Sequence, residues 1–88
     1  REQIRQISLS VEGVMGVHDL RTRMSGPVRF IQLHLELDDK MPLIEAHRIA
    51  DVVDDKLCKA FPGADVLIHQ DPYSLMFGPE RKQKLQSW

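Results

Sequence analysis

The sequence FIQLHLEL at residues 30–37 alternates between aliphatic side chains and a mixed set. Successive side chains of a strand point to opposite faces of a sheet, so this stretch predicts a strand with one core face and one outward face. The aliphatic face consists of Ile31, Leu33, Leu35 and Leu37. The outward face consists of Phe30, Gln32, His34 and Glu36.

The segments on either side of this strand predict a hairpin before it and a helix after it. Ser25-Gly26-Pro27 is a turn signal, and residues 17–24 before it have the character of a partner strand. A long helix is expected to begin at Pro42, because proline in a first helical turn has no N–H to lose, and to end at Pro62-Gly63. Its expected buried stripe is Ala46, Ile49, Ala50, Val53 and Leu57, with Phe61 one turn further on.

The two ends of the folded region complete the pattern. Residues 1–11 predict an amphipathic helix, since Ile4, Ile7 and Val11 recur at helical spacing. Residues 64–70 predict a last strand with Val66 and Ile68 on the core face. The order helix, strand, strand, helix, strand predicts an α+β fold, a ferredoxin-like or metallochaperone-like α-β-β-α-β sandwich. It has a three-stranded sheet with two helices on one face.

The second face of that sheet has no helix to cover it. It is expected to carry Phe30, Gln32, His34, Leu67, His69 and Asp71. A face with this mixture of apolar and metal-binding side chains is either solvated or meets a partner, most simply a second copy of the chain.

Composition sets the limits on class and partners. The 88 residues are enough for one small domain, and 12 basic against 13 acidic residues give a net charge of −1, so no global field attracts nucleic acid. The single cysteine, Cys58, excludes an intrachain disulfide and every CxxC motif. No apolar stretch approaches a membrane span, and there is no signal-peptide pattern. The start at Arg1, directly in a helical pattern, suggests a segment of a longer protein.

The histidines are the candidate functional residues. His69 and Asp71 alternate on the last strand, so their side chains project from the same face, where His34 is also expected. Imidazole and carboxylate are usual zinc ligands, and His18 and His47 are two further donors on other elements. The alternative is that all four histidines are ordinary solvated residues.

The other groups of polar residues are better explained as ordinary surface residues than as binding or catalytic sites. His47 and Asp51 stand at a chelating spacing, but such a pair is more often a solvated contact. A basic stripe of Arg21 and Arg23 near Phe30 leaves a small-ligand or RNA-binding sheet as a weaker alternative. No serine or threonine has a base positioned beside it and there is no phosphate-binding loop, so the chain is not expected to be an enzyme.

Several separated motifs carry a resemblance to a known family. They are HDLRTR at residues 18–23, SGP at 25–27, RFIQLHL at 29–35, Pro42-Leu43 with Ala46-His47, and FPGADV at 61–66 leading to IHQDP at 68–72. In this order and spacing they resemble the C-terminal cytoplasmic domain of cation diffusion facilitator transporters, of the bacterial YiiP/FieF type. The resemblance covers residues 1–72, which would form the metal-binding dimerisation domain. It does not cover residues 73–88, expected to be a partly ordered C-terminal arm.

The resemblance implies a role and a ligand set. The role is that of a zinc-sensing and dimerisation domain of a divalent-cation efflux transporter, a zinc/proton antiporter. Metal ligands fall on His18, His34, His47, His69 and Asp71, with Asp71 bridging two Zn²⁺ ions per protomer and Gln70 as a possible backbone ligand. Fe²⁺, Cd²⁺ or Co²⁺ could occupy the same donors.

The resemblance also implies partners and a location. A homodimer is expected, continuous with a transmembrane transport domain that this chain lacks, at the cytoplasmic face of the bacterial inner membrane. Two alternatives remain open at this point: a metal-independent dimerisation scaffold of the same transporter, and a small-ligand-binding ferredoxin-like domain.

Overall fold

The computed structural model describes residues 1–74 of the chain. Within these residues the elements follow the predicted order of helix, strand, strand, helix and strand. They are α1 (Glu2–Leu9), β1 (Gly16–Ser25), β2 (Val28–Leu37), α2 (Leu43–Ala60) and β3 (Asp65–Pro72). The α-β-β-α-β prediction is confirmed.

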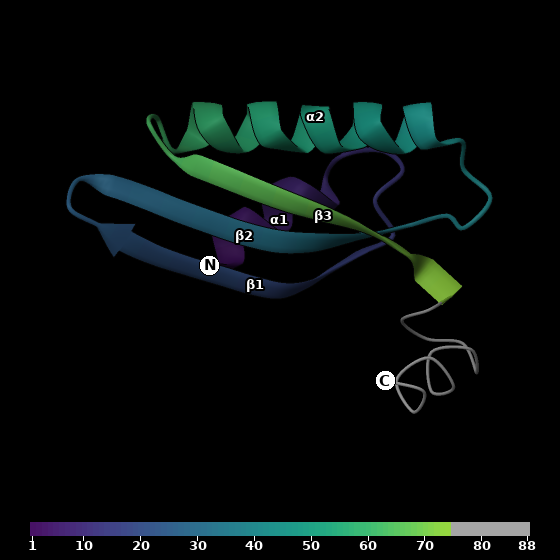
Figure 1. The fold of residues 1–88 in the computed structure, drawn as a ribbon, viewed down its shortest axis with the longest axis horizontal. Helices are drawn as coiled ribbons and strands as arrows, with labels where there is room; N and C mark the ends of the chain where they lie inside the picture. The colour runs from purple at the N-terminus through teal and green to yellow at the C-terminus, as the bar shows by residue number, and fades with distance from the viewer. Residues whose placement is uncertain (75–88) are drawn as a thin grey trace.

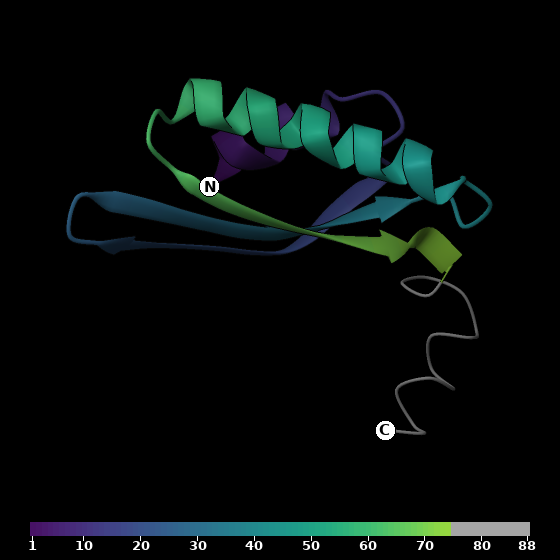
Figure 2. The same ribbon diagram turned by 45° about the horizontal axis from the view of Figure 1, so that its top comes forward.

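The strands form one three-stranded sheet in the order β1-β2-β3. β1 pairs with β2 in antiparallel fashion through the hairpin, and β2 pairs with β3 in parallel through the crossover that contains α2. Both helices lie on the same side of the sheet: α1 lies behind the strands and α2 above them in Figure 1, and both helices lie above the strands in the turned view of Figure 2. The other face, called the open face below, has no helix over it among the described residues.

The core lies between the helices and the covered face of the sheet. On β2, the side chains of Ile31, Leu33, Leu35 and Leu37 are at most 3% exposed, as the alternation in residues 30–37 predicts. From α2, the residues Ile49, Ala50, Val53 and Leu57 pack against them. Ile4 of α1 and Val11, which follows α1, are also buried in this core.

Element boundaries differ from the predicted ones by a few residues. α1 ends at Leu9 rather than at Val11. Ser10 is its C-cap, with its hydroxyl donating a hydrogen bond to the Ile7 carbonyl, and Gly13 three residues later has a left-handed φ of +98°. Val11 nevertheless stays buried. β3 continues to Pro72 rather than ending near residue 70, which keeps Asp71 inside the ladder.

β1 contains one irregularity that matters for the open face. Its pairing with β2 shifts register between His18 and Arg21, and Asp19 within this bulge has a positive φ of 51°. Aspartate tolerates this conformation better than most residues.

The last described residue, Ser74, contacts the loop between β2 and α2. The backbone N–H of Ser74 donates a 3.0 Å hydrogen bond to Asp39, while residues 75–88 of the predicted arm lie outside the described residues. No helix within residues 1–74 combines the length and the apolar character needed to cross a bilayer.

Candidate metal centre

Three imidazoles lie side by side across the open face. His18 of β1 pairs with His34 of β2, and His34 pairs with His69 of β3. The His18 and His34 rings are stacked with centroids 4.8 Å apart, and the His34 and His69 rings are stacked at 4.5 Å. The register of the sheet thus aligns one histidine from each strand.

The next outward position along the strands carries acidic groups. Gly16 of β1 pairs with Glu36 of β2, and Glu36 pairs with Asp71 of β3. The row of imidazoles therefore lies beside a row that consists of a glycine and two carboxylates.

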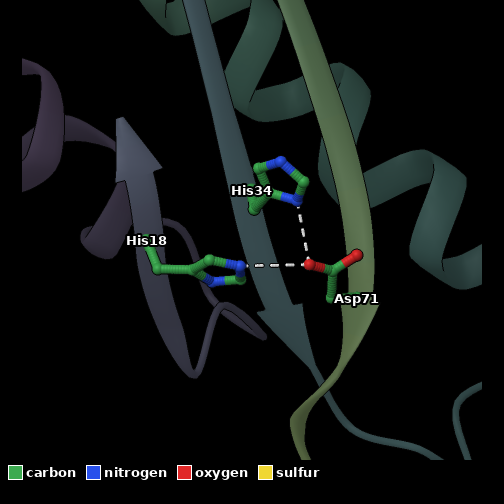
Figure 3. Close-up of side chains that lie close together, drawn as sticks. All are labelled: His18, His34 and Asp71. Atoms are coloured by element: carbon green, nitrogen blue, oxygen red, sulfur yellow. Dashed lines mark hydrogen bonds and ion pairs between the residues drawn. The ribbon is translucent and has the colours of Figure 1, made fainter. Parts of the chain in front are cut away.

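Asp71 joins two of the imidazoles. Its Oδ2 lies 2.9 Å from Nδ1 of His34 and 3.2 Å from Nε2 of His18, as Figure 3 shows. One ligand atom from each of these three residues lies within 4.8 Å of the other two. All three side chains are half-buried, so they are partly shielded from solvent and still accessible to an ion.

This spacing suits a tetrahedral metal ion. With zinc–nitrogen distances of about 2.0–2.1 Å, ligand atoms of a tetrahedral site are roughly 3.3 Å apart. The two distances from Asp71 Oδ2 to the imidazole nitrogens, 2.9 and 3.2 Å, are close to that value. Imidazole nitrogen with carboxylate oxygen is also a donor set that zinc accepts, so the residues fit the group.

The remaining predicted ligands lie outside this three-residue group. His69 is exposed and stacks on His34, and β2 separates it from His18. His47 is on α2, where its Nε2 lies 3.3 Å from Asp51. This is the solvated contact expected as the alternative to metal chelation by the pair. His47 also lines a shallow hollow with Gln70, so it lies near the end of β3 that carries the group.

Two acidic residues contact the group and were not among the predicted ligands. Glu36 Oε2 accepts a hydrogen bond from Nδ1 of His18 at 2.8 Å, and Asp19 Oδ2 lies 3.6 Å from Nε2 of His34. The hydrogen bond from Arg21 lowers the pKa of Asp19 below its ordinary value, which keeps that carboxylate charged. Alternation had placed Glu36 on the correct face, whereas the bulge that turns Asp19 toward His34 has no clear sequence signal.

Comparison with known families identifies the chain. Residues 1–73 match the family described as "Cation efflux protein, cytoplasmic domain". The chain therefore belongs to the cytoplasmic domain family of cation efflux proteins, as the resemblance in its motifs indicated.

Two relatives show how similar the chain is to individual proteins of this family. The chain is 53% identical to the cation-efflux pump FieF of Salmonella typhi over 85 residues, which cover 97% of this chain and 28% of the relative. It is 58% identical to FieF of Serratia proteamaculans over 83 residues, covering 94% of this chain and 27% of that protein. The chain thus spans little more than a quarter of the length of these relatives.

Solved structures show the same fold. The zinc form of CzrB superposes with a TM-score of 0.72 at 39% identity, covering 81% of this chain and 82% of that one. The metal-bound C-terminal domain of the CzcD transporter from Thermotoga maritima superposes with a TM-score of 0.75 at 28% identity, covering 81% and 84%. The predicted class of protein, a cytoplasmic domain of a cation efflux transporter, is confirmed.

Proposed function

We propose that this domain binds zinc on its open face and uses the bound ions to fix the relative orientation of two copies of the chain. The observation that carries the proposal is the convergence of His18, His34 and Asp71, whose ligand atoms lie within 4.8 Å of one another. The zinc form of the similar CzrB domain and the metal-bound CzcD domain support it.

The full proposed site contains two zinc ions per protomer. Asp71 bridges them, His18 and His34 hold one side, and His69 and His47 contribute on the other. His69 already lies against His34, while His47 would have to exchange its contact with Asp51 for the ion. Gln70 is the proposed backbone ligand because it lines the same hollow as His47.

The proposed setting is a transporter homodimer. The name of the matching family, ZT_dimer, refers to dimer formation, and the relatives are cation-efflux pumps of which this chain covers only 28%. We propose that the domain belongs to a zinc/proton antiporter and lies at the cytoplasmic face of the bacterial inner membrane. A difference in zinc affinity between two domain arrangements would then bias the attached membrane helices.

Zinc titration by calorimetry tests the site. The chain is expected to bind zinc, and Asp71→Ala is expected to remove more bound zinc per chain than His47→Ala, because a bridge serves two ions. Equal stoichiometry in the two variants would contradict bridging. Absence of zinc binding by the unaltered chain would contradict the site itself.

A metal-independent scaffold is the competing function. It is favoured by the fact that the imidazoles and carboxylates already satisfy one another by hydrogen bonds and stacking. Light scattering with and without chelator separates the two functions. A dimer that persists unchanged in chelator, in a chain that binds no zinc, would establish the scaffold.

A further inference from the structure

Glu36 is a buried carboxylate on a face that is otherwise open. The residue is only 4% exposed, although its neighbours on the same face, His34 and Asp71, are half-buried. Glutamate is rarely buried to this degree unless a partner compensates the loss of water. The partner here is His18, whose Nδ1 lies 2.8 Å from Glu36 Oε2.

This contact constrains which nitrogen of His18 carries the proton. A neutral imidazole has one N–H donor and one acceptor nitrogen, and a carboxylate can only accept. A hydrogen bond to Glu36 therefore requires the proton on Nδ1 and leaves the lone pair on Nε2. That second nitrogen faces Asp71 at 3.2 Å, but this contact is longer and lacks hydrogen-bond geometry, so the hydrogen bond to Glu36 decides the tautomer.

The neighbouring strand β1 leaves room for the Glu36 side chain beside His18. Gly16 lies directly across from Glu36, and a Cβ atom there would lie 2.9 Å from Glu36 Cδ and closer still to Oε1. Any other residue at position 16 would push the carboxylate from its place beside His18. Glycine at position 16 therefore allows the Glu36 carboxylate to lie beside His18.

We infer that Glu36 is a positioning residue that holds His18 as its Nδ1–H tautomer, with Nε2 presented to the metal. The inference rests on the proposed zinc site and adds an outer residue to it. Outer carboxylates that accept a hydrogen bond from a ligand histidine fix the ring and its tautomer, and their loss typically lowers metal affinity about 10–100-fold.

The test compares two substitutions with a charge-matched control in the 88-residue chain. Glu36→Gln keeps the shape and removes the charge, and Glu36→Met keeps the volume and removes the acceptor, so at least one variant should retain the fold. Asp65→Asn removes one carboxylate from the exposed start of β3, away from the group. Nitrogen NMR of the metal-free protein at about pH 8, where free imidazole is neutral, reports the His18 tautomer. Competition with a zinc chelator reports affinity.

The expected result is a dominant Nδ1–H tautomer in the unaltered chain and in Asp65→Asn, and a larger Nε2–H fraction in both Glu36 variants. Zinc affinity should fall about 10–100-fold only in the Glu36 variants. An unchanged tautomer in both Glu36 variants would overturn the inference. If the unaltered chain binds no zinc, the proposed function fails, while the tautomer in the metal-free protein still decides whether Glu36 holds the ring.

Discussion

Glu36 and Asp71 lie directly opposite each other in the parallel ladder between β2 and β3, so two carboxylates occupy adjacent positions on the open face. Like charges at paired positions destabilise a sheet by up to about 1 kcal/mol. The chain keeps both groups, and each contacts an imidazole. We expect this arrangement to lower the stability of the metal-free domain, and two adjacent carboxylates are suited to receive a cation.

The first prediction concerns Asp71→Asn. In excess chelator near neutral pH, the variant should be more stable than the unaltered chain by roughly 0.2–1 kcal/mol, because one of the two facing charges is removed. In zinc the order should reverse, since only the unaltered chain gains binding energy, about 2.7 kcal/mol at a free zinc concentration 100 times Kd. Urea unfolding under both conditions measures the two differences. A less stable variant in chelator would show that the contacts of Asp71 with His34 and His18 outweigh the repulsion.

The second prediction concerns Gly16. Its φ is not positive, so alanine fits the backbone and only the overlap with Glu36 opposes it. Gly16→Ala should cost about 1.5–3 kcal/mol of unfolding free energy, the usual contribution of a hydrogen bond to a charged group, because the new methyl group displaces the Glu36 carboxylate from its hydrogen bond with His18. In a Glu36→Ala background the cost should nearly vanish, because the overlapping side chain is gone. Additive costs in this double-mutant cycle would mean that the glycine is needed for another reason.

The fold could be predicted from the sequence because its signals are local. The alternation in residues 30–37 gave the core and open faces of β2, and the helical spacing of Ile49, Val53 and Leu57 gave the buried side of α2. The element order then left few arrangements, and the one with both helices on one face is observed. Only the ends of the elements differed, where side-chain capping and glycine conformations decide the boundary.

The candidate site was predicted less completely because it depends on register. Alternation placed His34, His69 and Asp71 on one face, but not which residue of β1 lies beside them. The bulge after His18 and the empty position at Gly16 set that geometry, and neither follows from hydrophobic pattern. For the same reason Glu36 was placed on the correct face without being recognised as a contact of the site.

The third prediction tests which surface forms the proposed dimer. Leu67 is 53% exposed on the open face, and Leu43 is 81% exposed at the start of α2. If the open face is the interface, Leu67→Gln should raise the dimer dissociation constant about tenfold or more, while the same change at Leu43 should leave it unaltered. Sedimentation at several concentrations measures both. Both substitutions should change monomer stability by no more than about 0.5 kcal/mol, because the side chains are exposed. A larger effect at Leu43 would place the interface at the helix end instead.

The fourth prediction concerns Cys58, whose Sγ donates a hydrogen bond to Asp54 Oδ1 at 3.3 Å one turn earlier on α2. The bond to Asp54, followed by partial burial, raises the pKa of the Cys58 thiol above its ordinary value, because a thiolate beside a carboxylate is unfavourable. Since the thiolate is the nucleophile, alkylation by iodoacetamide should be slow near neutral pH and should accelerate only at alkaline pH. Asp54→Asn should shift the rate profile to lower pH. Asp55→Asn, which acts on the thiol only through its charge, should shift it less. Superimposable profiles for the Asp54 variant and the unaltered chain would show that the hydrogen bond does not control the reactivity of Cys58.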